Sequence, residues 1–81
     1  MYRLEHCTTK AAFKAEPTQK TTLDLETLRH SYTVLLDAGL VIVLRINNTE
    51  VITHSYGELL IKTDDKNKAE HIAQTVYTHK T

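Results

Sequence analysis

The segment from Leu40 to Lys80 constrains the fold more than any other part of the chain. It holds three strand-like runs and one helix-like run, in this order: LVIVLRI at 40–46, TEVITHS at 49–55, ELLIKT at 58–63 and NKAEHIAQTVYTHK at 67–80. The first run is β-branched and too short for a typical independent helix, so it predicts a buried strand. Asn47-Asn48 and Tyr56-Gly57 predict turns, because Asn and Gly tolerate the positive φ angles of tight hairpins. The segment therefore predicts an antiparallel unit followed by a helix.

The last run has the apolar spacing of a helix that packs on one face. The residues of this face are Ala69, Ile72, Ala73, Val76 and Tyr77. Asp64, Asp65 and Asn67 are all good N-cap residues, and Asn67 with Glu70 has the spacing of a capping box. We therefore expect the helix to begin within this polar stretch and to cover one side of the strands.

The sequence does not determine the structure of the first 22 residues. Tyr2 to Thr8 alternates in polarity and predicts a short strand. Lys10 to Glu16 contains helix-forming residues and is followed by Pro17, which stops a helix. This stretch is either a helical turn or the continuation of a hairpin with the first segment, and TQKTT after it is a polar connector.

Leu23 to Ala38 predicts a second helix. Its stripe consists of Leu25, Leu28, Tyr32 and Leu35, and Gly39 stands where a helix cap is common. Thr21 to Asp24 fits a Thr-x-x-Asp start pattern. The competing interpretation is a strand over Tyr32 to Leu36 that turns at Ala38-Gly39 into the next strand.

Length and composition restrict the class of protein. Eighty-one residues correspond to one domain spanning residues 1–81. Ten basic and ten acidic residues give a formal net charge of zero, which argues weakly against a dedicated nucleic-acid binder. One cysteine, no signal sequence and no apolar run of about 20 residues lead us to expect a cytoplasmic protein outside the membrane.

The histidines and the cysteine do not form a motif that carries chemistry. The five histidines are His6, His30, His54, His71 and His79. None share a close metal-ligand spacing, and His6 and Cys7 would point to opposite faces of one strand. We therefore expect no metal site, no cofactor and no catalytic residue. An enzyme that uses Cys7 with a histidine is the weakest hypothesis.

The face of the sheet that the helices leave open is the candidate site. In the first strand-like run the more apolar set should face the helices, so its neighbours should face outward. This inward set consists of Leu40, Ile42, Leu44 and Ile46. The expected outward residues are Val41, Val43, Arg45, Thr53, Leu60 and Lys62. Such a face is more apolar than contact with solvent demands.

The strand ending in Tyr56-Gly57, followed by ELLIKTDDKNKAEHIAQTVY, resembles the half-repeat of TATA-box-binding protein. It is also similar to small archaeal proteins of that fold. Gly57 and Ala69 are the shared landmarks, within residues 40–80. The resemblance implies a curved antiparallel sheet with helices on one side and an open concave face. It does not imply DNA bending, because the only phenylalanine, Phe13, lies outside the matched region.

The sequence thus predicts an α+β two-layer sandwich, with an antiparallel sheet, helices on one face and the order β-α-β-β-β-α. The first functional hypothesis is a non-enzymatic binding module whose open face, through Arg45 and Lys62, contacts nucleic acid or another anionic partner. The alternative is a protein-interaction or accessory subunit that acts through an apolar patch formed by Val41, Val43 and Leu60. In that alternative the sheet face, or a sheet edge, could also form a homodimer.

Overall fold

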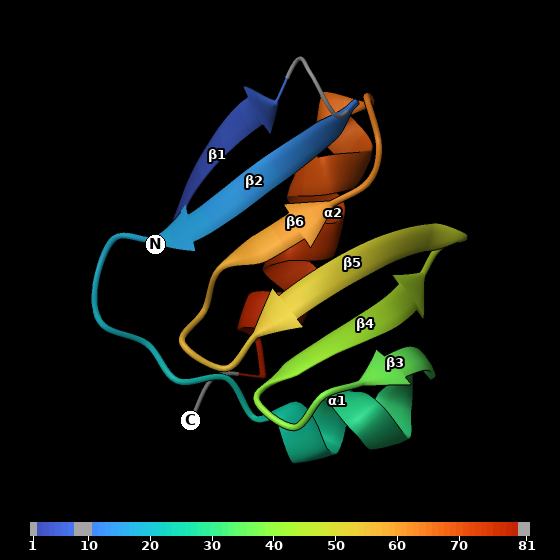
Figure 1. Cartoon of the computed structure of the whole chain (residues 1–81). Coiled ribbons are helices and arrows are strands. Elements are labelled where there is room, and N and C mark those ends of the chain that lie inside the picture. The colour runs from blue at the N-terminus through green and yellow to red at the C-terminus, as the bar shows by residue number, and fades with distance from the viewer. Residues whose placement is uncertain (1, 8–10, 80–81) are drawn as a thin grey trace.

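The computed structural model describes residues 2–7 and 11–79, and this part of the chain contains six strands and two helices (Figure 1). In chain order these are β1 (Tyr2–Cys7), β2 (Ala12–Pro17), α1 (Leu25–Ser31), β3 (Thr33–Asp37), β4 (Val41–Ile46), β5 (Thr49–His54), β6 (Leu59–Ile61) and α2 (Lys66–Tyr77). The strands form one sheet in the order β1-β2-β6-β5-β4-β3, and every neighbouring pair is antiparallel.

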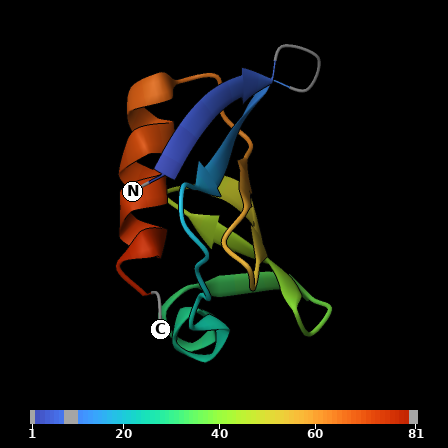
Figure 2. The same cartoon turned by 90° about the vertical axis from the view of Figure 1, so that its left-hand side faces the viewer.

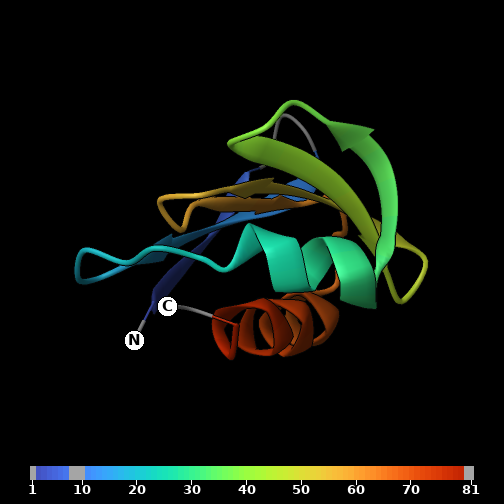
Figure 3. The same cartoon turned by 90° about the horizontal axis from the view of Figure 1, so that it is seen from below.

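Both helices lie on one side of this sheet, and no described element covers the other side (Figures 2 and 3). The buried residues of α1 and α2 join those of the strands in one hydrophobic cluster. Leu28 of α1, Ile72 of α2 and Leu44 of β4 are each fully buried in it. The α+β class, the antiparallel sheet and the placement of the helices on one face are therefore confirmed.

The helix predicted over Leu23–Ala38 is wrong beyond Ser31, and the competing strand is closer to the structure. Asp24 is the N-cap of α1, and its side chain accepts a hydrogen bond from the backbone N–H of Thr27 at 3.2 Å. The chain then turns into β3, which pairs with β4. Pairing with β4 satisfies the backbone hydrogen-bonding groups of this stretch. A continuous helix would have placed Leu35 on the buried stripe, but Leu35 is 39% exposed.

The stretch after the first strand follows the hairpin alternative. β2 pairs with β1 along its whole length and with β6 on its other side, so the hairpin extends the sheet. The element order is therefore β-β-α-β-β-β-β-α, which adds β2 and β3 to the predicted order. Thr8 and Lys10, included in the predicted segments, lie outside the described residues.

The turns of the second half match the prediction, and one of the three predicted N-cap residues, Asp65, is confirmed, whereas the predicted capping box is wrong. Asn47 and Asn48 have φ angles of +52° and +60°, and Gly57 has a φ angle of +108°. Asp65, not Asn67, caps α2: its carboxylate accepts hydrogen bonds from the N–H groups of Asn67 and Lys68. Asn67 thus lies inside the helix, and the predicted capping box with Glu70 does not form.

Tyr77 joins the end of α2 to two other elements. Its hydroxyl donates a hydrogen bond to the carbonyl oxygen of Gly57 at 2.6 Å, and its ring centre lies 5.1 Å from that of Tyr2. Burial raises the pKa of the Tyr77 hydroxyl well above its usual value near 10. A Cβ atom at Gly57 would stand 2.7 Å from Cγ of Pro17, so β2, α2 and the β5–β6 turn meet at a position that only glycine fits.

Candidate functional site

The two-residue turn at Asn47-Asn48 determines which side chains reach the open face. It pairs Ile46 with Thr49, and the same register pairs Ile42 with Thr53. Directly paired residues of an antiparallel sheet share a face. Ile42 and Thr53 are both fully buried on the helix side. The prediction that Thr53 faces outward is therefore wrong.

The other five predicted residues occupy the open face. Val41, Val43 and Arg45 alternate with the buried residues of β4, and Leu60 alternates with the buried residues of β6. Lys62 follows β6 on the same side as Leu60, and its ammonium group lies 3.8 Å from the carboxylate of Glu50. Val41, Val43 and Leu60 are partly exposed, and Arg45 and Lys62 are exposed.

One line of apolar side chains crosses the open face at right angles to the strands. Pairing places Leu36 of β3 beside Val43, Val43 beside Ile52 of β5, and Ile52 beside Leu60 of β6. We call these four residues the apolar row. It crosses the face that is turned toward the viewer in Figure 1, from β3 to β6. Four neighbouring aliphatic side chains on an otherwise solvated face make a contiguous apolar patch.

Exposure is greatest at the β3 end of the row. Among the described residues, four large hydrophobic side chains are exposed: Leu35, Leu36, Leu40 and Tyr56. Three of the four lie on β3 or in the turn after it. The prediction that Leu40 faces the helices is wrong, because Leu40 precedes β4 and is 72% exposed. Leu36 itself is 62% exposed, and the register between β3 and β4 shifts between Val34 and Leu36. The shift leaves Leu35 without a paired residue on β4.

The charges on the open face balance. By register and alternation, the described charged residues on it are Arg3, Lys14, Arg45 and Lys62 against Glu5, Glu16, Glu50 and Glu58. Four positive and four negative side chains give the face no net charge. The signs are interleaved, because Lys14 lies 2.8 Å and Arg3 lies 3.6 Å from the carboxylate of Glu16. This face therefore lacks the basic excess that phosphate binding favours.

The contact between Lys14 and Glu16 also affects how both groups titrate. The hydrogen bond and the charge of Lys14 lower the pKa of the Glu16 carboxyl, and Glu16 in turn raises the pKa of the Lys14 ammonium. Both groups thus stay ionised over a wider pH range than they would alone. At the end of the open face formed by β2, Lys14 and Glu16 therefore both remain ionised, and their charges cancel.

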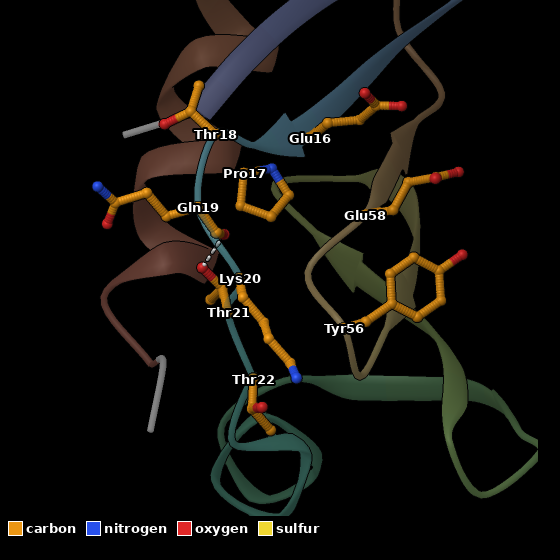
Figure 4. A pocket seen from close by; sticks show the side chains of 9 residues that line it. All are labelled: Glu16, Pro17, Thr18, Gln19, Lys20, Thr21, Thr22, Tyr56 and Glu58. Carbon is orange, nitrogen blue, oxygen red and sulfur yellow. Dashed lines mark hydrogen bonds between the residues drawn. The ribbon is translucent and has the colours of Figure 1, made fainter.

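A surface pocket of about 400 Å³ adjoins this end of the face (Figure 4). It is lined by Glu16, Pro17, Thr18, Gln19, Lys20, Thr21, Thr22, Tyr56 and Glu58. One wall is the connector from β2 to α1, and the other is the β5–β6 turn. In Figure 4 the carboxylates of Glu16 and Glu58 point the same way, toward the open face, and the Tyr56 ring lies beside them. The sequence showed the connector only as a polar stretch.

The histidines and Cys7 are spread over both faces of the sheet in the described part of the chain. His6 interacts with the Asp64 carboxylate at 3.1 Å, and its ring centre lies 4.7 Å from that of Phe13, on the helix side. Cys7 is the next residue of β1 and so points to the other face. Residues 2–7 and 11–79 contain no group of three or more His, Cys, Asp or Glu side chains that could hold a metal ion.

Sequence reasoning missed Leu36, Ile52 and Glu50 on the open face. Leu36 was hidden by the predicted helix. Ile52 was missed because β5 carries an aliphatic residue on each face, Val51 and Ile52, so alternation alone does not orient the strand. The usable signal was the turn, because a two-residue hairpin at Asn47-Asn48 fixes the register of β4 against β5. With the apolar set of β4 facing the helices, that register places Ile52 outside.

Compared with protein-family models, curated proteins and solved structures, the chain shows no significant match. The likeness to the TATA-box-binding fold thus stays a prediction. No helix within the described residues has the length and apolar character needed to cross a membrane.

Proposed function

We propose that this chain is a non-enzymatic protein-interaction module that binds its partner through the apolar row on the open face. The observation that carries the proposal is the row itself. Its four residues stand side by side on four neighbouring strands, and no described element lies above them. The single cysteine favours action in a reducing compartment such as the cytoplasm.

The surroundings of the row support a protein as the partner. Protein interfaces combine an apolar centre with a polar rim. Here the row is flanked on one side by Arg45, Glu50 and Lys62, which follow each other on β4, on β5 and just after β6. On its other side lie Val41 and His54, a directly paired couple. A mixed rim of this kind gives specificity to a protein contact without attracting polyanions.

The nucleic-acid hypothesis has less support. It relies on Arg45 and Lys62, but Lys62 lies beside Glu50, and the carboxylates on the face equal the basic groups in number. A phosphate backbone approaching the face would meet these carboxylates as well as the two cations. Phosphate contacts are strongest at low ionic strength, so the nucleic-acid hypothesis predicts binding to mixed-sequence DNA or RNA at about 50 mM salt.

Photo-crosslinking from the centre of the row tests the proposal. A photoreactive amino acid is placed at position 52 in one variant and at position 74 in a control. Gln74 is exposed on α2, behind the sheet. After irradiation in cells that make the protein, we expect position 52 to give discrete protein adducts that position 74 does not give.

Two outcomes would contradict the proposal. One is an equal pattern of adducts from positions 52 and 74, which would show that the apolar row has no preferred partner. The other is an adduct at position 52 whose added mass is removed by nuclease, which would assign the face to nucleic acid. Circular dichroism of both variants checks that the substitutions leave the fold intact.

A further inference from the structure

We propose that the partner of the apolar row is a second copy of this chain, packed face to face about a two-fold axis. This inference rests on the proposed function and specifies its partner. The axis runs parallel to the strands and passes between β4 and β5. Such an axis places β4 of one copy over β5 of the other, and β3 over β6. The contact is isologous, since each pair of facing residues occurs twice.

The apolar row is complementary to itself under this axis. Val43 faces Ile52 of the second copy, and Leu36 faces Leu60 of the second copy, because each pair lies at equal distances on either side of the axis in the sheet order. All four side chains become buried against aliphatic partners. Leu36 gains most, since it is 62% exposed in the single chain. Two sheets packed in this way keep their strands nearly aligned, as sandwiches do.

The charges beside the row are complementary under the same axis. Arg45 and Glu50 are a directly paired couple on β4 and β5. The axis therefore brings Arg45 over Glu50 of the second copy, and Glu50 over Arg45. No like charges face each other at this level, because Thr33 of β3 lies over Lys62. An axis between β5 and β6 would instead place Glu50 over Lys62, but it would also set part of the apolar row against charged residues of β1 and β2.

The sheet edges are less suited than the face to a second copy. At β3 the register shift between Val34 and Leu36 interrupts the regular strand that edge pairing requires. At β1 the outward side chains Arg3 and Glu5 are charged and exposed, which opposes edge-to-edge association. The zero net charge of the chain removes long-range repulsion between copies and so permits the face contact.

The size of the contact sets its strength. The four strands are three to six residues long. With neighbouring strands about 4.8 Å apart and a rise of about 3.3 Å per residue, they give a patch no larger than about 20 Å on a side. This is at the small end of specific interfaces, so we expect a dimer that dissociates on dilution. The β1–β2 hairpin of each copy extends past the β3 edge of the other.

Charge reversal in two separate chains tests the arrangement. Arg45→Glu sets two carboxylates against each other at both charge contacts of its own dimer, and Glu50→Arg sets two guanidinium groups against each other there. Each variant alone should be monomeric by sedimentation velocity at concentrations where the wild type is dimeric. Mixed in equal amounts, the two variants should form a heterodimer, because each of its two charge contacts then joins a carboxylate to a guanidinium group. Lys66→Glu, at an exposed position of α2, changes the net charge as Arg45→Glu does; it is the control and should dimerise like the wild type.

Each alternative result overturns the inference. A wild type that stays monomeric up to millimolar concentration excludes the second copy, but it leaves the proposed function standing if position 52 forms adducts with a different protein. Single variants that remain dimeric, or a mixture that stays monomeric while both variants are folded by circular dichroism, exclude this axis. Position 52 without specific adducts overturns both proposals.

Discussion

The hydroxyl group of Thr53 is fully buried and has no hydrogen-bond partner among the described residues. Its neighbours across the strands, Ile42 and Leu59, are buried aliphatic residues. An unsatisfied polar atom in such a place costs free energy, because its hydrogen bonds to water are lost on folding and not replaced. Threonine is common on the solvent-facing side of strands, but pairing with Ile42 places Thr53 on the helix side, so the predicted outward orientation is wrong.

We expect Thr53→Val to stabilise the protein. Valine keeps the branched shape of threonine and removes the unpaired hydroxyl, so the free energy of unfolding should rise by about 1 kcal/mol. Urea unfolding followed by circular dichroism measures the change. Thr33→Val, at an exposed position of β3, is the matched control and should shift the free energy by less than about 0.5 kcal/mol. A destabilised Thr53→Val would show that the hydroxyl has a partner.

The elements differ in how much of them the sequence could predict. The strands β4 and β5 and the helix α2 are locally determined, because β-branched runs, an Asn-Asn turn and an apolar helical stripe agree with one another. The stretch from Leu25 to Asp37 is not locally determined, because its apolar residues fit one helical stripe from Leu25 to Leu35. Its division into α1 and β3 is decided by pairing with β4, a tertiary contact that single-sequence patterns do not contain.

The α1–β3 boundary can be tested with two leucines that a continuous helix would place on one stripe. Leu28 is fully buried, whereas Leu35 is 39% exposed on β3. A seven-residue helix is held by tertiary packing, so Leu28→Ala should lower the free energy of unfolding by about 3 kcal/mol. Leu35→Ala should lower it by less than about 1 kcal/mol. Equal losses in urea unfolding would contradict the boundary and favour the long helix.

The molecule as a whole is a sheet with one face covered and one face open. A chain of 81 residues has little room for a deep cavity, and the pocket beside the β5–β6 turn is a surface feature. The open face as the candidate site, with five of its residues, could be predicted from strand alternation. The apolar row could not, because its members Leu36 and Ile52 depend on the β3–β4 pairing and on the hairpin register.

The most direct test of the proposed dimer asks whether a second copy of the chain covers the apolar row. A neutral soluble paramagnetic compound weakens the NMR signals of solvent-accessible methyl groups. At about 20 µM protein, the methyl groups of Val43, Ile52 and Leu60 should be weakened, and the exposed methyl of Thr78 should be weakened as well. At about 1 mM, where a small interface is occupied, the three row residues should become protected while Thr78 stays accessible. Weakening of the row signals that does not change with concentration would contradict the face-to-face dimer.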